Sequence, residues 1–428
     1  MSIQEDTLRI QDDMMTPLTD EFAVDMIISA DDHLMEAPTI WQDRLPAKYR
    51  EIGPRVERQR GRVVNAGGGS GWKYSRVNDD EAGTLCDVWR YEDRTIPIYG
   101  QTALAGGSQA DYGFNPITFD QMRPGTYEPL ARVADMDVNR VEMSVGFPNT
   151  FVRFAGQGFL DGKDKELALL CVRAYNDWVV DFSNQTRGRV IKVGIIPLWD
   201  PALAAVEVRR IAALGCHIVV FSELPFKLGL PSLHSDHWHP FIRTCEEVGT
   251  VISIHTGSSS QFQTTSDDAV PVTPSVMTFV NPLMSMSDWI MSGTLQKFPN
   301  LRVFFAECEI GWLPYTLQRM DRAWNMHWAW GWGEGVNGHD VLPKPPSQYF
   351  HEQILCAFAD DAFGAQSVEQ IGVDNIAFEV DFPHSGGTWP HSFDVAMDLL
   401  KHVDAATKKK ILRDNAIRFL NLTVPARL

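Results

Sequence analysis

Positive charge is scarce in this chain: 38 Lys and Arg residues stand against 55 Asp and Glu residues, which gives a formal net charge of -17. Nucleic acids and anionic membranes bind proteins mainly through stripes of basic residues, and the sequence has no such stripe. We therefore expect no nucleic-acid partner and no membrane partner. A small molecule is the expected ligand.

Paired cysteines and long apolar runs are also missing. Six cysteines are scattered along the chain without paired spacing: Cys86, Cys171, Cys216, Cys245, Cys308 and Cys356. This distribution excludes a disulfide framework and a zinc finger. No apolar run is long enough to span a bilayer, and the first twenty residues have neither the basic nor the apolar segment of a secretory signal. These absences predict a soluble cytoplasmic protein.

A phosphate-binding glycine loop is missing as well. The glycine run at residues 66–71 is not followed by Lys-Ser or Lys-Thr and has no strand-turn-helix context, so we interpret it as a flexible loop. It belongs to a longer stretch, residues 50–130, that contains too many glycines and prolines for helices. We interpret this stretch as an irregular insertion over one end of the domain, with at most a small hairpin at residues 63–64 or 89–91.

Elsewhere the sequence alternates between short apolar segments and amphipathic helical patterns. Eight strands are expected, at residues 26–30, 141–147, 190–196, 217–221, 251–255, 301–306, 354–358 and 375–378. This alternation is typical of a parallel sheet buried on both faces. It predicts an α/β fold, a (β/α)8 TIM barrel with a long insertion after the first strand. An open doubly wound sheet is the alternative, but its glycine-rich first turn is absent.

The barrel is expected to form a single domain at residues 21–428, preceded by a flexible N-terminal arm at residues 1–20. In such a barrel the functional groups stand at the carboxyl ends of the strands. Ionisable residues occur at several of these ends: Asp31, His33, Glu223, His255, Glu307, Glu309, Asp381 and His384. Each alone could cap a helix or form a buried hydrogen bond. Together they predict a divalent-metal site on one rim, because imidazoles and carboxylates are the usual ligands.

The first strand shows how such a site would begin. Asp31 and His33 are two residues apart, so alternation along a strand points both side chains to the same side, as chelation requires. A turn followed by a helix cap is the alternative interpretation of this segment.

At these motifs the chain resembles the amidohydrolase superfamily, in the amidohydrolase-related branch near aminocarboxymuconate-semialdehyde decarboxylase. The resemblance extends from Met26 to about Leu422. Its separate motifs are Asp31-Asp32-His33, residues 251–257, residues 298–322 with the core Glu-Cys-Glu-Ile-Gly-Trp, Asp381-Phe-Pro-His384, and the closing helix at residues 411–420.

The resemblance implies a metal ion held by Asp31, His33, His255 and Asp381. Two positions depart from the family pattern, because Asp31 replaces the first histidine of a common His-x-His pair and Glu307 stands where strand six commonly ends in histidine. A carboxylate at the first position is compatible with Zn²⁺ and makes the site more favourable for Mn²⁺. No lysine ends strand four, so we expect one divalent ion, with Zn²⁺ first and Mn²⁺ as the alternative.

These ligands predict a metal-dependent hydrolase that acts on a small, aromatic-derived molecule with an amide, ester, lactone or carbon–carbon bond. A metal-activated water would attack, Asp381 would move its proton, and Glu307 would orient water or substrate, with His255 in the same catalytic group. The alternative is a non-oxidative decarboxylase of an aromatic or muconate-type carboxylate, in which Asp381 or Glu307 protonates the carbon. A non-catalytic binding barrel is the alternative from another class.

Further residues are assigned by their place beside the rim. Substrate contacts are predicted from His384, His391, Glu223 and Trp389. We interpret His234, His237 and His239 as loop and cap residues rather than a second metal site. The aromatic stretch at residues 324–332 is interpreted as a substrate wall, a subunit contact or ordinary packing, and exposed aromatic residues there predict a homodimer.

Overall fold

The structure is a computed structural model that describes residues 24–65, 75–108, 113–270 and 272–425. The predicted arm at residues 1–20 and the glycine run at residues 66–71 lie outside these described residues. In the described part, no helix is both long enough and apolar enough to cross a membrane.

Within the described residues, eight parallel strands form the centre of the molecule. They are β1 (Ile27–Leu34), β6 (Val141–Pro148), β7 (Val190–Lys192), β8 (Ile218–Phe221), β9 (Val251–His255), β10 (Val303–Ala306), β11 (Ile354–Phe358) and β12 (Ile376–Phe378). Each strand overlaps one predicted apolar segment, and all their residues are buried except two in β7. Burial on both faces explains why these strands are mostly apolar, and the polar residues of β1 and β9 include the predicted metal ligands.

Hydrogen bonds close the strands into a ring. The parallel ladders join β1, β6 and β7 in one group and β8 to β12 in another. Gly194 connects the groups on one side, because its N–H donates to the Ile218 carbonyl and its own carbonyl accepts from Val220 N–H, both at 2.9 Å. The TIM-barrel prediction is confirmed.

The second closure lies at the strand ends that carry the predicted metal ligands. The N–H of Asp381, three residues after β12, donates to the carbonyl of Asp31 in β1 at 2.9 Å, and His33 N–H donates to the Phe382 carbonyl at 2.6 Å. The same backbone bonds that complete the barrel therefore fix Asp31, His33 and Asp381 relative to one another.

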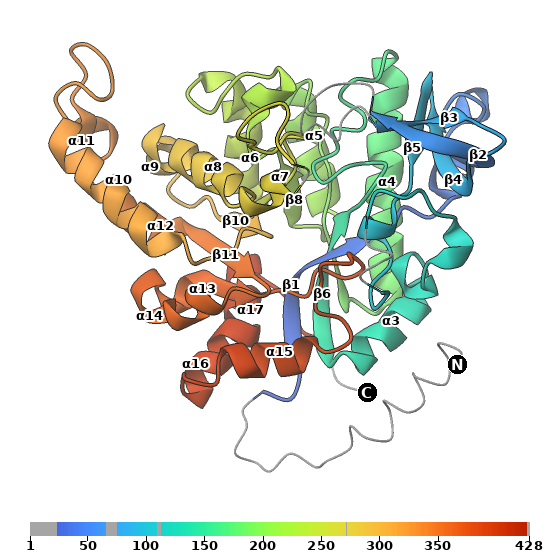
Figure 1. Cartoon of the computed structure of the whole chain (residues 1–428). Helices are drawn as coiled ribbons and strands as arrows, with labels where there is room; N and C mark the ends of the chain where they lie inside the picture. The colour runs from blue at the N-terminus through green and yellow to red at the C-terminus, as the bar shows by residue number, and fades with distance from the viewer. Residues whose placement is uncertain (1–23, 66–74, 109–112, 271, 426–428) are drawn as a thin grey trace.

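Helices surround the barrel (Figure 1). They are α2 (Ile40–Arg44), α3 (Pro129–Val138), α4 (Lys165–Gln185), α5 (Pro201–Ala212), α6 (His239–Val248), α7 (Thr273–Val276), α8 (Val280–Met291), α9 (Thr294–Lys297), α10 (Leu313–His327), α11 (Gly338–Val341), α12 (Pro346–Gln353), α13 (Ala362–Gln366), α14 (Val368–Ile371), α15 (Ser392–Leu399), α16 (Ala405–Lys409) and α17 (Asn415–Leu420). Asp200 caps α5 as its sequence indicates, since the carboxylate accepts from two N–H groups of the first turn and Pro201 follows.

The segment predicted as an irregular insertion contains an antiparallel sheet. Its strands are β2 (Arg55–Asn65), β3 (Ser75–Asp79), β4 (Thr84–Tyr91) and β5 (Arg94–Pro97), in the order β3-β2-β4-β5. The two candidate hairpin segments, 63–64 and 89–91, lie in the paired strands β2 and β4. Cross-strand ion pairs, such as Arg58 to Asp87 at 2.8 Å, lie in this sheet. Charged residues therefore interrupt the alternation of apolar residues from which strands were predicted.

The aromatic stretch at residues 324–332 lies on a projection formed by α10 and α11, which reaches away from the barrel (Figure 1). Two of its indoles are packed: Trp324 donates to the Leu342 carbonyl at 2.8 Å and Trp332 to the Met291 carbonyl at 3.0 Å. Trp328 and Trp330 are exposed, Trp330 to 66 %. The stretch contributes nothing to the cavity described below, so the substrate-wall interpretation was wrong, and the homodimer stays a prediction that sedimentation velocity can test.

Candidate metal centre

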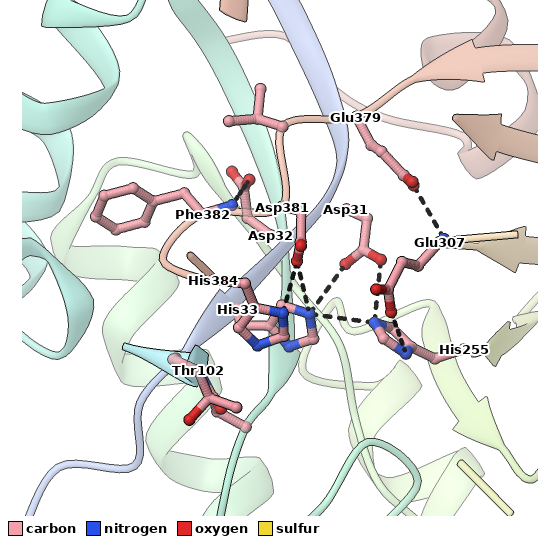
Figure 2. A network of polar contacts seen from close by, with 12 residues as sticks. Asp31, Asp32, His33, Thr102, His255, Glu307, Glu379, Asp381, Phe382 and His384 are labelled. Atoms are coloured by element: carbon pink, nitrogen blue, oxygen red, sulfur yellow. Dashed lines mark hydrogen bonds and ion pairs between the residues drawn. The ribbon is translucent and has the colours of Figure 1, made fainter. Parts of the chain in front are cut away.

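Three buried side chains from two strands meet at the carboxyl end of the barrel (Figure 2). Asp31 and His33 come from β1, and His255 ends β9. The Nε2 atoms of the two imidazoles are 3.1 Å apart, and Asp31 Oδ2 lies 3.0 Å from His255 Nε2. Asp31 Oδ1 is 3.7 Å from His33 Nε2. The ligand atoms of these residues are close enough to share one ion.

Backbone carbonyls fix the tautomers of both histidines. His33 Nδ1 donates to the Pro148 carbonyl at 2.9 Å, and His255 Nδ1 donates to the Thr256 carbonyl at 2.6 Å. Burial, supported by the neighbouring His384, lowers the pKa of His33 to about 3, so this imidazole is neutral. With each Nδ1 proton used, the two Nε2 atoms are left as acceptors 3.1 Å apart, an arrangement that a cation bound to both would stabilise.

Asp381 and His384 extend the cluster on the side of His33. Asp381 Oδ1 lies 3.4 Å from His33 Nε2 and 2.8 Å from His384 Nδ1. The His384 ring stacks on the His33 ring with centroids 3.8 Å apart. Burial opposes ionisation of Asp381, but the imidazoles of His384 and His33 hold its pKa below the usual range. Asp381 is therefore ionised and placed to act as a further ligand.

Negative charge is in excess around the cluster, as expected where a cation binds. Burial raises the pKa of Asp31 well above its ordinary value, and the carboxylates of Asp381 and Asp32 add to the effect. The pKa values of Glu307 and Glu379 rise for the same reasons, burial first. Neither carboxylate oxygen of the buried Asp31 accepts a hydrogen bond. Unpaired oxygens, facing lone pairs and surplus charge all fit a divalent cation.

Asp32 points away from the cluster and anchors it. Its Oδ1 accepts from the Phe382 N–H at 2.9 Å, and its Oδ2 accepts from Ser144 Oγ and lies 3.3 Å from the guanidinium of the buried Arg132. Arg132 also donates to the His33 carbonyl at 3.2 Å. Arg132 could not be found from the sequence, since no local pattern links it to a strand that lies 99 residues earlier.

A cavity of about 660 Å³ opens above the cluster. Its floor includes Glu307, Asp381 and His384. The walls come from the insertion with Tyr99, the loop after β6 with Arg153 and Phe154, and the loop after β9 with Phe262. The Phe154 ring packs against the His255 ring with centroids 4.4 Å apart, so an aromatic wall adjoins the candidate metal ligands. The insertion thus supplies part of the cavity wall at this end of the barrel.

Of the four predicted substrate contacts, His384 lines the cavity and the other three do not. Glu223 Oε1 accepts from Ser259 Oγ at 2.7 Å and from Asn281 Nδ2 at 2.9 Å, and thus holds the loop after β9. Trp389 donates to the Asp135 carbonyl at 3.2 Å, on the outer side of the loop after β12. His391 is exposed where α15 begins.

The path of the loop explains why Trp389 and His391 do not line the cavity. Gly386 still lines the cavity, but a Cβ on Gly387 would meet the Val380 and Asp381 carbonyl oxygens at 2.7 and 2.8 Å. The chain therefore turns back tightly over its own strand end at Gly387 and carries the following residues out of the cavity. Glu309 is likewise absent from the cavity wall.

Glu36 fixes the loop after β6. Its buried carboxylate accepts from the N–H groups of Asn149, Phe151 and Val152 at 3.0–3.3 Å. Burial raises its pKa from 4.5 to about 7 despite these bonds. Because the folded-state pKa is the higher one, the associated stability is fully present below pH 4.5 and is lost as the pH rises through 7.

This shift predicts a pH-dependent stability. Between pH 4.5 and 8 the free energy of unfolding of the wild type should fall relative to that of Glu36→Gln, which carries no titratable group there, by about 3 kcal/mol. Urea unfolding of both proteins across this range measures the difference. A difference that does not change with pH would show that burial does not raise the pKa of Glu36.

The protein is a closed parallel barrel with buried imidazoles and carboxylates at its strand ends. These features are those of barrel enzymes, here with a candidate metal centre. Comparison with known proteins identifies the family within this class. A sequence model of the family described as Amidohydrolase matches residues 86–422, and the chain belongs to this family. The resemblance stated from the sequence motifs is confirmed.

Three solved structures share the fold. An amidohydrolase from Mycobacterium avium subsp. paratuberculosis K-10 has a TM-score of 0.65 at 20% identity, over 92% of this chain and 99% of that chain. A 2,6-dihydroxybenzoate decarboxylase from Rhizobium has a TM-score of 0.57 at 16% identity, over 93% and 99%. A 5-carboxyvanillate decarboxylase from Novosphingobium aromaticivorans, complexed with manganese, has a TM-score of 0.55 at 20% identity, over 68% and 79%.

Proposed function

We propose that this protein is a metal-dependent, non-oxidative decarboxylase of an aromatic carboxylate. Hydrolysis was the first expectation from the sequence, and decarboxylation was its alternative. The names of two of the similar structures, both decarboxylases of substituted benzoates, support the alternative better. The observation that carries the proposal is the carboxyl group of Glu307, which lines the cavity floor beside His255, where it can deliver a proton to a bound ring carbon.

Asp31, His33, His255 and Asp381 would hold a single divalent ion. When bound, a divalent ion would offset the surplus of buried carboxylates and hold the anionic substrate by its oxygen atoms. Two carboxylate ligands make the set hard enough for Mn²⁺, the ion bound in one of the similar decarboxylases, and we therefore place Mn²⁺ before Zn²⁺.

The two acidic residues of the cavity floor would have different roles in proton transfer. Asp381 is ionised, and Glu307, which also lines the cavity floor, would act as the proton donor. The bond between the ring carbon and the carboxylate breaks, carbon dioxide leaves, and the electron pair stays on the ring carbon. That carbon takes the proton from Glu307, whose Oε2 lies 3.8 Å from His255 Nδ1, and water then restores the proton to Glu307. Phe154 provides a flat surface for the ring.

Hydrolysis is the second candidate, and the ionised Asp381 favours it. A carboxylate with a lowered pKa at the cavity floor is suited to take a proton from an attacking water. One of the similar structures is an amidohydrolase, which agrees with this chemistry.

Isotope labelling separates the two candidates. Mn²⁺-loaded protein is incubated with hydroxybenzoates in D₂O, and we expect carbon dioxide together with deuterium on the vacated ring carbon. Chelator-treated protein should be inactive and regain activity when Mn²⁺ is restored. In a parallel experiment with esters, amides and lactones in ¹⁸O-labelled water, appearance of ¹⁸O in the product without release of carbon dioxide from any hydroxybenzoate would support hydrolysis instead.

A further inference from the structure

The cavity wall contains a cation that the metal centre does not use. Among the described lining residues, Arg153 is the only lysine or arginine, while Asp267, Glu307 and Asp381 are acidic. Its Nη2 donates to Ser260 Oγ at 3.4 Å, and no carboxylate in the described part of the chain forms an ion pair with it. Burial lowers the pKa of Arg153 to about 10, which leaves the side chain charged at neutral pH. A guanidinium has five N–H donors, so most of its binding capacity is open to a ligand.

Two buried carboxylates hold the loops on either side of this guanidinium. Glu36 accepts from three N–H groups of the segment that ends one residue before Arg153. Glu223 binds the N–H groups of Gly257 and Ser259, immediately before Ser260. The guanidinium is thus placed by a rigid frame instead of a free surface loop, which reduces the entropy lost on binding a ligand.

The backbone at this position is strained. Arg153 and its hydrogen-bond partner Ser260 both have left-handed conformations, with φ of 63° and 60°. Such a conformation is unfavourable for a residue other than glycine and persists where the surrounding structure imposes it, often at binding sites. Strain at both partners indicates that the surrounding structure holds the guanidinium in this position.

An aromatic surface links Arg153 to the metal centre. The neighbouring residue, Phe154, packs its ring on His255 and, with centroids 5.1 Å apart, on His33. A Cβ on Gly257 would lie 3.2 Å from both the Phe154 and Phe262 rings, so the glycine lets the two rings approach. A flat ligand body that lies along this surface would have one end at the metal ligands and the other in the part of the cavity lined by Arg153.

We infer that the substrate carries a second acidic group, a carboxylate remote from the bond that breaks, and that Arg153 binds it. The planar guanidinium can donate two parallel hydrogen bonds to a carboxylate, and the described wall residues offer such a group no other lysine or arginine. The substrate is then an aromatic dicarboxylate. This inference deepens the proposed function and rests on it for the fate of the first carboxylate.

Binding measurements test the inference without turnover. Isothermal titration calorimetry of Mn²⁺-loaded full-length protein compares benzoate with the three benzenedicarboxylate isomers. We expect at least one isomer to bind about tenfold or more tightly than benzoate, because a charged hydrogen bond adds to the contacts. Arg153→Gln should weaken that isomer by about 10- to 100-fold and leave benzoate within about twofold. Arg153→Lys should restore only part of the affinity, since an ammonium lacks the two-pronged geometry.

Three results would overturn the inference: no isomer binds more tightly than benzoate, Arg153→Gln leaves the preferred isomer unaffected, or it weakens benzoate and the isomer equally. Arg209→Gln, which removes the same charge from an exposed helix position, is the matched control and should change neither affinity. Manganese content is measured in each variant to separate an effect on the metal. If no aromatic acid releases carbon dioxide, the proposed reaction fails, while the binding result still decides the role of Arg153.

Discussion

Asp381→Asn should lower kcat by about 10³-fold or more and leave the protein folded. Asp381 supplies the ionised carboxylate at the cavity floor, between the imidazoles of His33 and His384, and an amide of the same shape carries no charge. The backbone is left intact, because asparagine tolerates the left-handed conformation at this position, where φ is 60°. The N–H that closes the barrel on the Asp31 carbonyl is also retained.

Steady-state kinetics and circular dichroism measure this prediction. Asp398→Asn makes the same chemical change at a side chain on α15 that is 77 % exposed, and it should leave kcat unchanged. Near-normal turnover of Asp381→Asn would remove Asp381 from the mechanism in both the decarboxylase and the hydrolase proposals.

His255→Ala is expected to lower the affinity for Mn²⁺ by more than about 100-fold, since removal of an outer-sphere partner alone costs 10- to 100-fold. The substitution deletes the Nε2 atom that lies within 3.1 Å of both His33 Nε2 and Asp31 Oδ2. Elemental analysis and Mn²⁺ titration measure the loss. His255→Gln, which fills more of the space, should show the same loss and guards against a defect caused by the cavity alone.

A second histidine provides the matched control for metal binding. His234→Ala alters an exposed residue that pairs with Asp288 at 3.1 Å in a loop before α6. It should leave the metal content unchanged, because His234 belongs to no group of candidate ligands in the described residues. An unchanged metal stoichiometry in His255→Ala would contradict the assignment of His255 as a ligand.

The barrel could be predicted from the sequence because strands buried on both faces are mostly apolar. Each of the eight strands overlaps a short apolar segment of the sequence. The meeting of Asp31 and His33 also follows, since residues two apart on a strand share a side. Their closeness to His255 follows only if the barrel closes, and the eight alternating strand and helix segments indicate that it does.

Other features depend on contacts that no local pattern encodes. Arg132 and Arg153 lie far in the sequence from the groups they serve, and each becomes informative only when burial and partners are known. Trp389 and His391 were predicted as substrate contacts from their nearness to Asp381 in the sequence. The tight turn at Gly387 sends them elsewhere, and nearness along the chain does not reveal that direction.

The central claim is that distant segments bind one divalent ion at the mouth of the barrel. The most direct measurement is an anomalous difference map from crystals of Mn²⁺-supplemented protein, recorded on both sides of the metal absorption edge. We expect one strong peak within bonding distance of Asp31, His33, His255 and Asp381. Two separate peaks, a peak away from these residues, or no peak in protein that was never exposed to chelator would contradict it.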